Sequence, residues 1–306
     1  MENSEKPYRD FNSYLRELFG CRVQKITLDA GLTCPNRDGT VGRGGCIYCN
    51  LRGSGTGFGR TLSIREQLER GKKFLGKRYK AKKFLAYFQS FSNTYGPLEK
   101  LKRLYDEALS VPDVVGLSVG TRPDCVSSDV LDLLAGYQTK YLVWIEYGLQ
   151  SAKDETLKII NRGHSVGDFV KAVEKTRLRK IPVCVHVILG LPGENPEDMI
   201  STAKFLAKLD IQGVKIHLLY VIRGTKLHEM YEEGNYRCLD RETYVKLVGE
   251  FIAHLPPRVV IQRITGDPHR HELVAPAWAL EKRKNVNMIH AYMKKHVLFQ
   301  GKYYKK

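Results

Sequence analysis

Three cysteines in one glycine-rich stretch constrain this chain more than any other feature of its sequence. Cys34, Cys46 and Cys49 lie in the segment LTCPNRDGTVGRGGCIYCN, which follows a strand-like run at residues 23–29. Thiolates bind iron and zinc, and glycine lets backbone N–H groups approach a compact inorganic cluster. The segment therefore predicts a metal site. Three thiolates would hold three irons of a [4Fe–4S] cluster and leave the fourth open to another ligand.

A structural zinc site is the main alternative, because the pair Cys46-x-x-Cys49 suits either metal. Structural zinc takes four ligands, and Cys21 is the nearest candidate for the fourth. Cys21 precedes the strand-like run while Cys34 follows it, and an extended run of that length spans roughly 25 Å. The loop also contains no histidine. The pattern thus favours iron–sulfur over zinc, and unliganded cysteines are the third alternative.

The composition indicates a cytoplasmic protein that binds a polyanion. Seven cysteines spread over 306 residues are an odd number, which does not suit a secreted disulfide framework. The sequence has no run of eighteen apolar residues and no secretory signal at its start, so we expect no membrane segment. Fifty Lys and Arg against 33 Asp and Glu give a net charge of +17. Such an excess favours nucleic acid as a partner, with an unspecific basic surface as the alternative.

Apolar strand-like runs alternate with helical stretches along most of the chain. This alternation implies parallel strands joined by right-handed crossovers. Because the runs are nearly continuous in Val, Ile and Leu, we expect strands covered on both faces and an apolar barrel lumen. Six such units predict an α/β fold with a partial (β/α)6 TIM-like barrel, and a doubly wound open sheet is the alternative. The predicted strands are residues 23–29, 84–89, 114–119, 142–149, 183–189 and 214–219.

The last quarter of the chain has a different pattern. Residues 240–253 predict a helix, residues 258–264 a further strand, and the segment after 276 a long basic helix ending near Lys295. We expect a barrel over residues 1–239, with its cluster loop at 31–50, and an α/β extension packed on it over residues 240–306. The final KYYKK mixes basic and aromatic residues as single-stranded RNA binders do, or is simply a solvated tail.

The cysteine loop resembles that of the radical S-adenosylmethionine (SAM) superfamily, in which Cys-x-aromatic-Cys follows the first strand. Eleven residues separate Cys34 from Cys46, an insertion similar to the branch that contains the Elongator catalytic subunit. The string CPNRDGT…GRGGCIYCN resembles the YhcC/YtqA (MnmL-type) group of that branch. The resemblance implies a [4Fe–4S] cluster on the three cysteines, SAM on the open iron, and an electron donor such as flavodoxin or ferredoxin.

The same resemblance implies five residues that bind SAM. Tyr48 would pack on its adenine, and Gln89 would meet its amino group through backbone atoms. Gln150, in EYGLQS, would contact SAM, and Arg162, in NRGH, would pair with its carboxylate. His186, in HVILGLPG, would lie near the ribose. Structural alternatives are a loop aromatic for Tyr48, a helix C-terminal cation for Arg162 and a satisfied core histidine for His186.

Substrate contacts are expected from Arg122, in GTRPD, and from Tyr220 and Arg223, in HLLYVIRGT. An arginine fork matches a carboxylate or phosphate, although Arg122 could instead form a salt bridge with Asp124. The resemblance and the charge together indicate tRNA, with reductive cleavage of SAM driving conversion of 5-carboxymethylaminomethyl-uridine to 5-aminomethyl-uridine at the wobble position. The alternatives are a radical SAM enzyme for a small or porphyrin-like molecule and a non-catalytic zinc-binding RNA protein.

Overall fold

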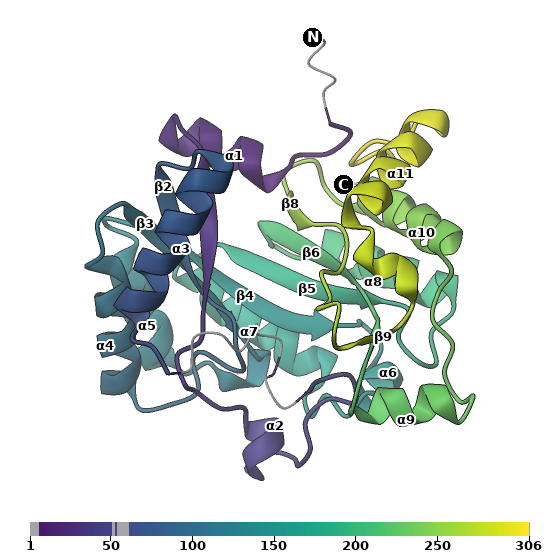
Figure 1. Ribbon diagram of the computed structural model, residues 1–306, viewed down its shortest axis with the longest axis horizontal. Coiled ribbons are helices and arrows are strands. Elements are labelled where there is room, and N and C mark those ends of the chain that lie inside the picture. Colours follow the sequence, from purple (N-terminus) through teal and green to yellow (C-terminus); the bar gives the residue numbers. More distant parts are fainter. Residues whose placement is uncertain (1–5, 51–52, 54–60, 306) are drawn as a thin grey trace.

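A seven-stranded parallel sheet curls into an incomplete barrel (Figure 1). The computed structural model describes residues 6–50, 53 and 61–305. Along the sheet the strands follow the order β1-β2-β3-β4-β5-β6-β8, and every neighbouring pair is parallel. The partial barrel is therefore confirmed. The strands are β1 Val23–Leu28, β2 Lys83–Phe88, β3 Val114–Thr121, β4 Leu142–Gln150, β5 Val183–Leu189, β6 Gly213–Leu218 and β8 Val260–Arg263.

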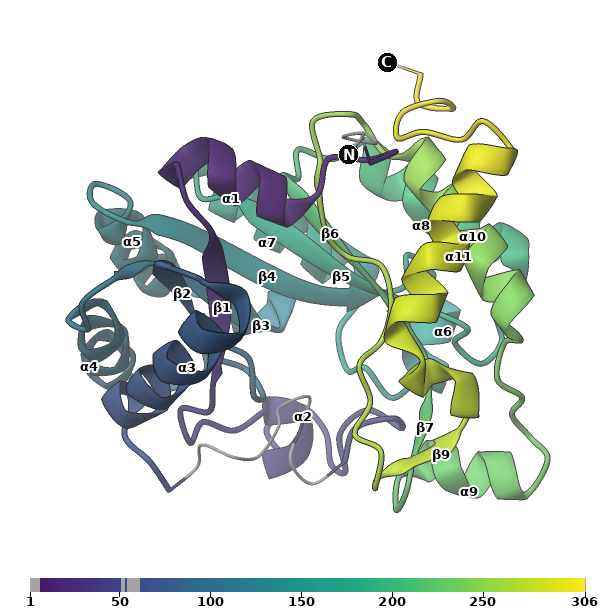
Figure 2. The same ribbon diagram turned by 45° about the horizontal axis from the view of Figure 1, so that its top comes forward.

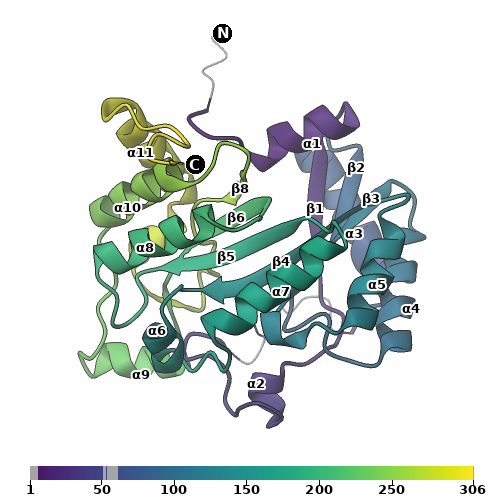
Figure 3. The same cartoon turned by 180° about the vertical axis from the view of Figure 1, so that it is seen from behind.

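Helices cover the outer face of this sheet, as the view from behind shows for α4, α5, α7 and α8 (Figure 3). Ser63 and Ser165 begin α3 and α7 with capping boxes, as their sequences predict. Apolar side chains of the strands and helices form one continuous core between the two layers. The helices are α1 Phe11–Phe19, α2 Pro35–Asp38, α3 Ile64–Tyr79, α4 Leu98–Leu109, α5 Ser128–Tyr137, α6 Asp154–Ile159, α7 Val166–Leu178, α8 Pro196–Ala207, α9 Lys226–Glu232, α10 Arg241–His254 and α11 Lys282–Lys295.

The inner face of the sheet is polar, and the expected apolar lumen is wrong. Lys25, Ser118, Glu146, His186 and Lys215 come from five different strands and form one hydrogen-bonded group. Parallel strands read as continuously apolar when helices cover both faces, but here the second face lines a cavity. Single polar residues within otherwise apolar strands therefore mark the inward positions.

The C-terminal residues build on the barrel, and α1 lies across the ends where the strands begin (Figure 2). α10 packs against α8 and α11, and the further strand predicted at 258–264 is β8, which pairs with β6. The Gln300 amide donates to the Pro256 and Val259 carbonyls at 2.8 and 2.6 Å. A separate two-stranded sheet pairs β7 (Val221–Ile222) with β9 (Leu273–Ala275).

Two further points concern sequence predictions about the ends and the membrane. In the final KYYKK, Lys302 and Tyr303 are exposed, and the last lysine, at position 306, lies outside the described residues. Within the part of the chain that the structure describes, the helices are too short or too polar to cross a membrane.

Candidate cluster and cofactor site

The loop after β1 shapes the backbone around the three cysteines. Cys34 is the N-cap of α2, and its carbonyl accepts from Arg37 N at 2.8 Å. Cys49 N donates to the Cys46 carbonyl at 2.9 Å, so the Cys-x-x-Cys segment forms a tight turn. Gly44 and Gly45 precede it with φ values of 79° and 78°, a conformation that favours glycine. The glycines of the motif are thus required by the turn itself.

Cys34, Cys46 and Cys49 line one cavity at the ends where the strands finish. Burial, together with the nearby charges of Cys46 and Cys34, raises the pKa of the Cys49 thiol to about 12. The three sulfurs are therefore close enough to influence one another. Cys21 precedes β1 at the opposite end of that strand and is not among the described residues that line the cavity.

The spacing of these sulfurs fits an iron–sulfur cluster better than zinc. Among the described residues, the one triple of His, Cys, Asp or Glu side chains whose ligand atoms all lie within 4.8 Å of one another is Glu146, Cys184 and His186. At least one pair of the three loop sulfurs therefore lies more than 4.8 Å apart. A tetrahedral zinc with bonds of about 2.3 Å would hold its sulfurs roughly 3.8 Å apart. In a cubane each thiolate binds a different iron, so wider spacing is required.

Arg162 connects the cysteine loop to the end of β4. Its Nη1 donates to Cys46 Sγ at 3.6 Å, and its Nε and Nη2 donate to the Gly148 carbonyl at 3.2 and 2.6 Å. A Cβ on Gly148 would lie 2.7 Å from Nη2, so glycine makes room for the guanidinium. Hydrogen bonds to the sulfurs tune such clusters. Arg162 therefore joins Cys46 to the end of β4, and its role is not limited to neutralising the C-terminal end of α6.

The other predicted SAM residues, Tyr48, Gln89, Gln150 and His186, line the same cavity. Gln150 ends β4 at a register shift with a φ of 77°, which is strained for a residue with a side chain. Its buried Oε1 accepts no hydrogen bond within the described structure. Buried polar atoms normally have partners, so a strained residue with an unused acceptor facing a cavity is suited to a ligand.

The three predicted substrate residues are not brought together. Arg122 lines the cavity, but its Nε and Nη2 donate to Asp124 at 2.9 and 2.7 Å and its Nη1 donates to the Arg162 carbonyl. The salt-bridge alternative is therefore what is observed. Neither Tyr220 nor Arg223 is among the described lining residues. Arg223 is exposed in the turn that directly follows β7, where its backbone N–H donates to the Glu272 carbonyl at 2.9 Å.

Glu146 lies at the centre of the polar lumen. Its carboxylate accepts from Lys25 Nζ at 2.5 Å, from His186 Nε2 at 2.7 Å, and also from Ser118 and Lys215. Burial alone would raise the pKa of Glu146, but the two ammonium groups bring it well below its usual range. Burial lowers the pKa of Lys215 to about 7, against the opposing effect of Glu146.

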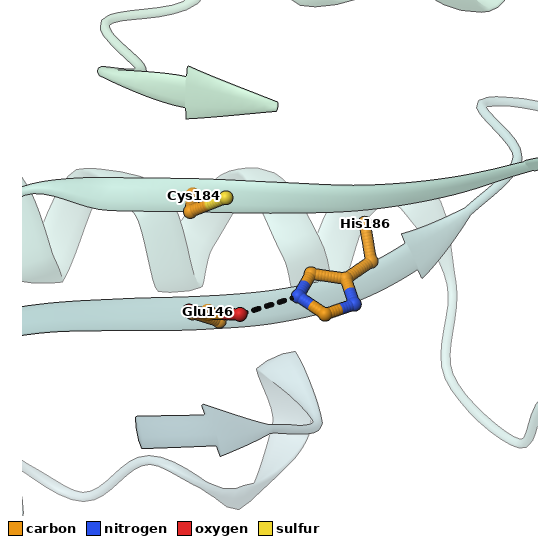
Figure 4. Close-up of side chains that lie close together, drawn as sticks. All are labelled: Glu146, Cys184 and His186. Atoms are coloured by element: carbon orange, nitrogen blue, oxygen red, sulfur yellow. Dashed lines mark hydrogen bonds and ion pairs between the residues drawn. The ribbon is translucent and has the colours of Figure 1, made fainter. Parts of the chain in front are cut away.

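The triple of Glu146, Cys184 and His186 is not a metal site. Figure 4 shows His186 directed at the Glu146 carboxylate, with Cys184 on the same strand as His186. Both carboxylate oxygens already accept hydrogen bonds, and the lysine ammonium groups would repel a cation. The hydrogen bond also matches the core-histidine alternative for His186. Its predicted contact with the ribose stays a prediction.

Lys215, His217 and Arg263 also line the cavity, although their sequence context did not single them out as site residues. Lys215 and His217 alternate with apolar residues in β6, which reads GVKIHL. Arg263 is the last residue of β8. Alternation of this kind was the available signal, because successive strand residues point to opposite faces.

Two models of known protein families match the chain. Residues 37–206 match the model of the radical SAM superfamily, and residues 211–295 match that of the radical SAM C-terminal domain. Protein YtqA of Bacillus subtilis (strain 168) is 41% identical over 305 residues, which cover 99% of this chain and 95% of YtqA.

More distant similarity extends to a tRNA uridine(34) acetyltransferase and, in fold, to a solved structure of Elp3. The tRNA uridine(34) acetyltransferase of Dehalococcoides mccartyi (strain CBDB1) is 29% identical over 175 residues, which are 56% of this chain and 37% of that protein. The solved structure of the archaeal Methanocaldococcus infernus Elp3 with an N-terminal deletion superimposes with a TM-score of 0.68 at 20% identity, covering 91% of this chain and 64% of the other. The latter similarity is one of fold.

Proposed function

Because the chain belongs to the radical SAM superfamily, as an enzyme whose cofactors are a [4Fe–4S] cluster and SAM, we propose that it modifies tRNA at the wobble uridine. The proposed reaction converts 5-carboxymethylaminomethyl-uridine to 5-aminomethyl-uridine. The CH₂ carbon of the carboxymethyl group would lose one hydrogen atom and then one electron to a one-electron acceptor. Water would hydrolyse the resulting imine, so that the carbon–nitrogen bond breaks and the two carbons leave as glyoxylate.

The observation that carries this proposal is the similarity to the tRNA uridine(34) acetyltransferase, which extends over 175 residues, or 56% of this chain. The net charge of +17 supports a polyanionic substrate, because Lys and Arg contacts to phosphates supply most of the affinity for nucleic acid. The chain spans only 37% of that relative's length, so the proposal does not extend to acetyl transfer.

We assign the cofactor roles to residues that meet around the cavity. Cys34, Cys46 and Cys49 would hold the cluster, and Arg162 would orient both Cys46 and the SAM carboxylate. When bound, the two cofactors would supply abstraction of a hydrogen atom from a C–H bond of the substrate side chain. The protein positions the substrate carbon and excludes competing groups.

Nucleoside mass spectrometry tests the reaction. The reconstituted enzyme, SAM and a one-electron reductant are incubated without oxygen with tRNA that carries 5-carboxymethylaminomethyl-uridine. We expect 5-aminomethyl-uridine to form, and no product with the Cys34→Ser variant. tRNA from a strain that lacks the gene should accumulate the carboxymethylated nucleoside. Unchanged wobble uridines in both experiments would refute the substrate, and the enzyme class would stand.

Binding to tRNA itself is tested by its salt dependence. Retention of tRNA should fall steeply as the salt concentration rises, because phosphate contacts release bound counterions. Retention that does not change with salt would argue against a phosphate-binding surface.

A further inference from the structure

The cavity that the three cysteines line carries an excess of positive charge. Glu146 is the only acidic side chain among its described lining residues, whereas Lys215 and Arg263 line the same region and Lys25 lies directly beside it. Glu146 is shared between the two lysines, both of which donate to its carboxylate. One carboxylate therefore faces three basic side chains.

Arg263 is the base that Glu146 does not neutralise. Arg263 in β8 is paired in register with Lys215 in β6, and both residues line the cavity. Its guanidinium makes no hydrogen bond or ion pair within the described part of the chain, although the residue is half-buried. No Arg263 nitrogen is among the buried, unpartnered side-chain atoms of the described residues, so the guanidinium stays open to solvent and is available to an acidic ligand.

A second unused polar group lies next to it. The Nε2 atom of His217 is buried and has no hydrogen-bond partner among the described residues. The His217 ring stacks on that of His186 with centroids 5.1 Å apart, which fixes its orientation at the cavity. Burial lowers the pKa of His217 well below its usual value, so the ring is neutral and can donate through one nitrogen.

We propose that Arg263, with His217 as a second donor, binds the carboxylate of the substrate side chain. This inference rests on the proposed function, which gives the substrate a carboxymethyl group. Arg263 takes the role expected of Arg122, whose guanidinium is occupied by Asp124. An arginine fork that holds the carboxylate fixes the adjacent CH₂ group between the cavity floor and the cysteine loop. Arg263 is thereby a specificity residue that selects acidic over neutral side chains.

The test compares two anticodon-loop RNAs that differ by one charge. One carries the carboxymethylaminomethyl side chain, and the other carries the same side chain with its carboxylate converted to a primary amide. Dissociation constants are measured by fluorescence anisotropy with the reconstituted enzyme and SAM, in the absence of reductant. The phosphates are identical, so any difference reports on the side chain.

We expect the wild-type enzyme to bind the carboxylate RNA roughly ten- to hundredfold more tightly, the range for hydrogen bonds to charged groups. Arg263→Gln should bind both RNAs equally, and Arg263→Lys should keep part of the preference. Arg258→Gln is the matched control, because Arg258 is exposed just before the same strand and should leave the preference unchanged. Iron content and cluster absorbance verify that each variant is folded.

Each outcome decides one hypothesis. Equal affinities in the wild type, or an unchanged preference in Arg263→Gln, would overturn the carboxylate site; the wild-type comparison does so even if a variant fails to fold. A wild-type preference without formation of 5-aminomethyl-uridine would refute the proposed reaction and leave the carboxylate site standing. Product formation that is equally fast in the wild type and in Arg263→Gln would support the proposed reaction and overturn the carboxylate site.

Discussion

Replacing Glu146 with glutamine should destabilise the barrel more than any other single charge-neutralising change in the lumen. The side chain of Glu146 is 0% exposed, and those of Lys215 and Lys25 are 5% and 15% exposed. Glutamine keeps the shape but leaves two ammonium groups without a counter-charge. Removing one partner of a buried ion pair costs about 3–5 kcal/mol, and we expect a loss of that size in the free energy of unfolding.

The loss should depend on pH in a defined direction. Lys215 has a folded pKa of about 7, below its unfolded value, so this group makes stability rise with pH between about 7 and 10.4. Without Glu146 the folded pKa of Lys215 falls further. Below pH 7 the wild-type lysine is then protonated while the variant's is not. The stability difference should therefore grow as the pH falls below 7, by up to about 1.4 kcal/mol per pH unit, and stay constant above it.

Urea unfolding at pH 6 and pH 9, followed by tryptophan fluorescence and far-UV circular dichroism, measures this difference. Glu229→Gln is the matched control, because Glu229 pairs with Lys226 on the surface and should cost less than about 0.5 kcal/mol. Adding Lys215→Met to Glu146→Gln should recover part of the loss, because it removes the buried amine that has to give up its proton when the single variant folds. A loss below about 1 kcal/mol at pH 6, or no recovery in the double variant, would refute the reasoning.

Three further changes test the site. Cys34→Ser should abolish the brown [4Fe–4S] absorbance and lower the iron content, whereas Cys21→Ser should retain both; equal loss in the two variants would contradict the assignment. Arg162→Lys should retain iron yet weaken SAM binding roughly tenfold or more, because a lysine cannot reach the Gly148 carbonyl and Cys46 together. An unchanged dissociation constant for SAM in equilibrium dialysis would argue against this role of Arg162. Burial lowers the pKa of His186 to about 4, so the unfolded state takes up a proton first as the pH falls. His186→Asn should therefore reduce the loss of stability between pH 6.5 and 4, as measured by urea unfolding, and an unchanged pH dependence would contradict this.

Local patterns in the sequence predicted the elements of the fold closely. The six barrel strands lie within two residues of their predicted bounds, because short runs of Val, Ile and Leu bounded by polar residues have few other interpretations. Ser63 and Ser165 likewise predict the helices that they begin, because a capping box is a local arrangement of four residues.

Contacts between distant residues could not be predicted in the same way. Glu146 meets Lys25 from 121 positions away and Lys215 from 69 positions away, and no local pattern joins the three. Arg122 illustrates the same limit. Its motif allows both a ligand contact and a salt bridge, and only the packed geometry selects Asp124. Arg263 carries no motif and becomes notable only when its neighbours are known.

The error about the lumen has a general physical cause. The outer face of each strand packs on helices and therefore needs apolar residues, whatever the inner face of the strand contacts. In β4 the residues on either side of Glu146 are buried and apolar, so one charged residue does not disturb the strand pattern. Charged residues within mainly apolar strands indicate which positions face inward. A charge can be buried there only where partners from other strands compensate for its desolvation. Lys25, Glu146 and Lys215 are such exceptions on three strands, and together they define the wall against which a substrate can be held.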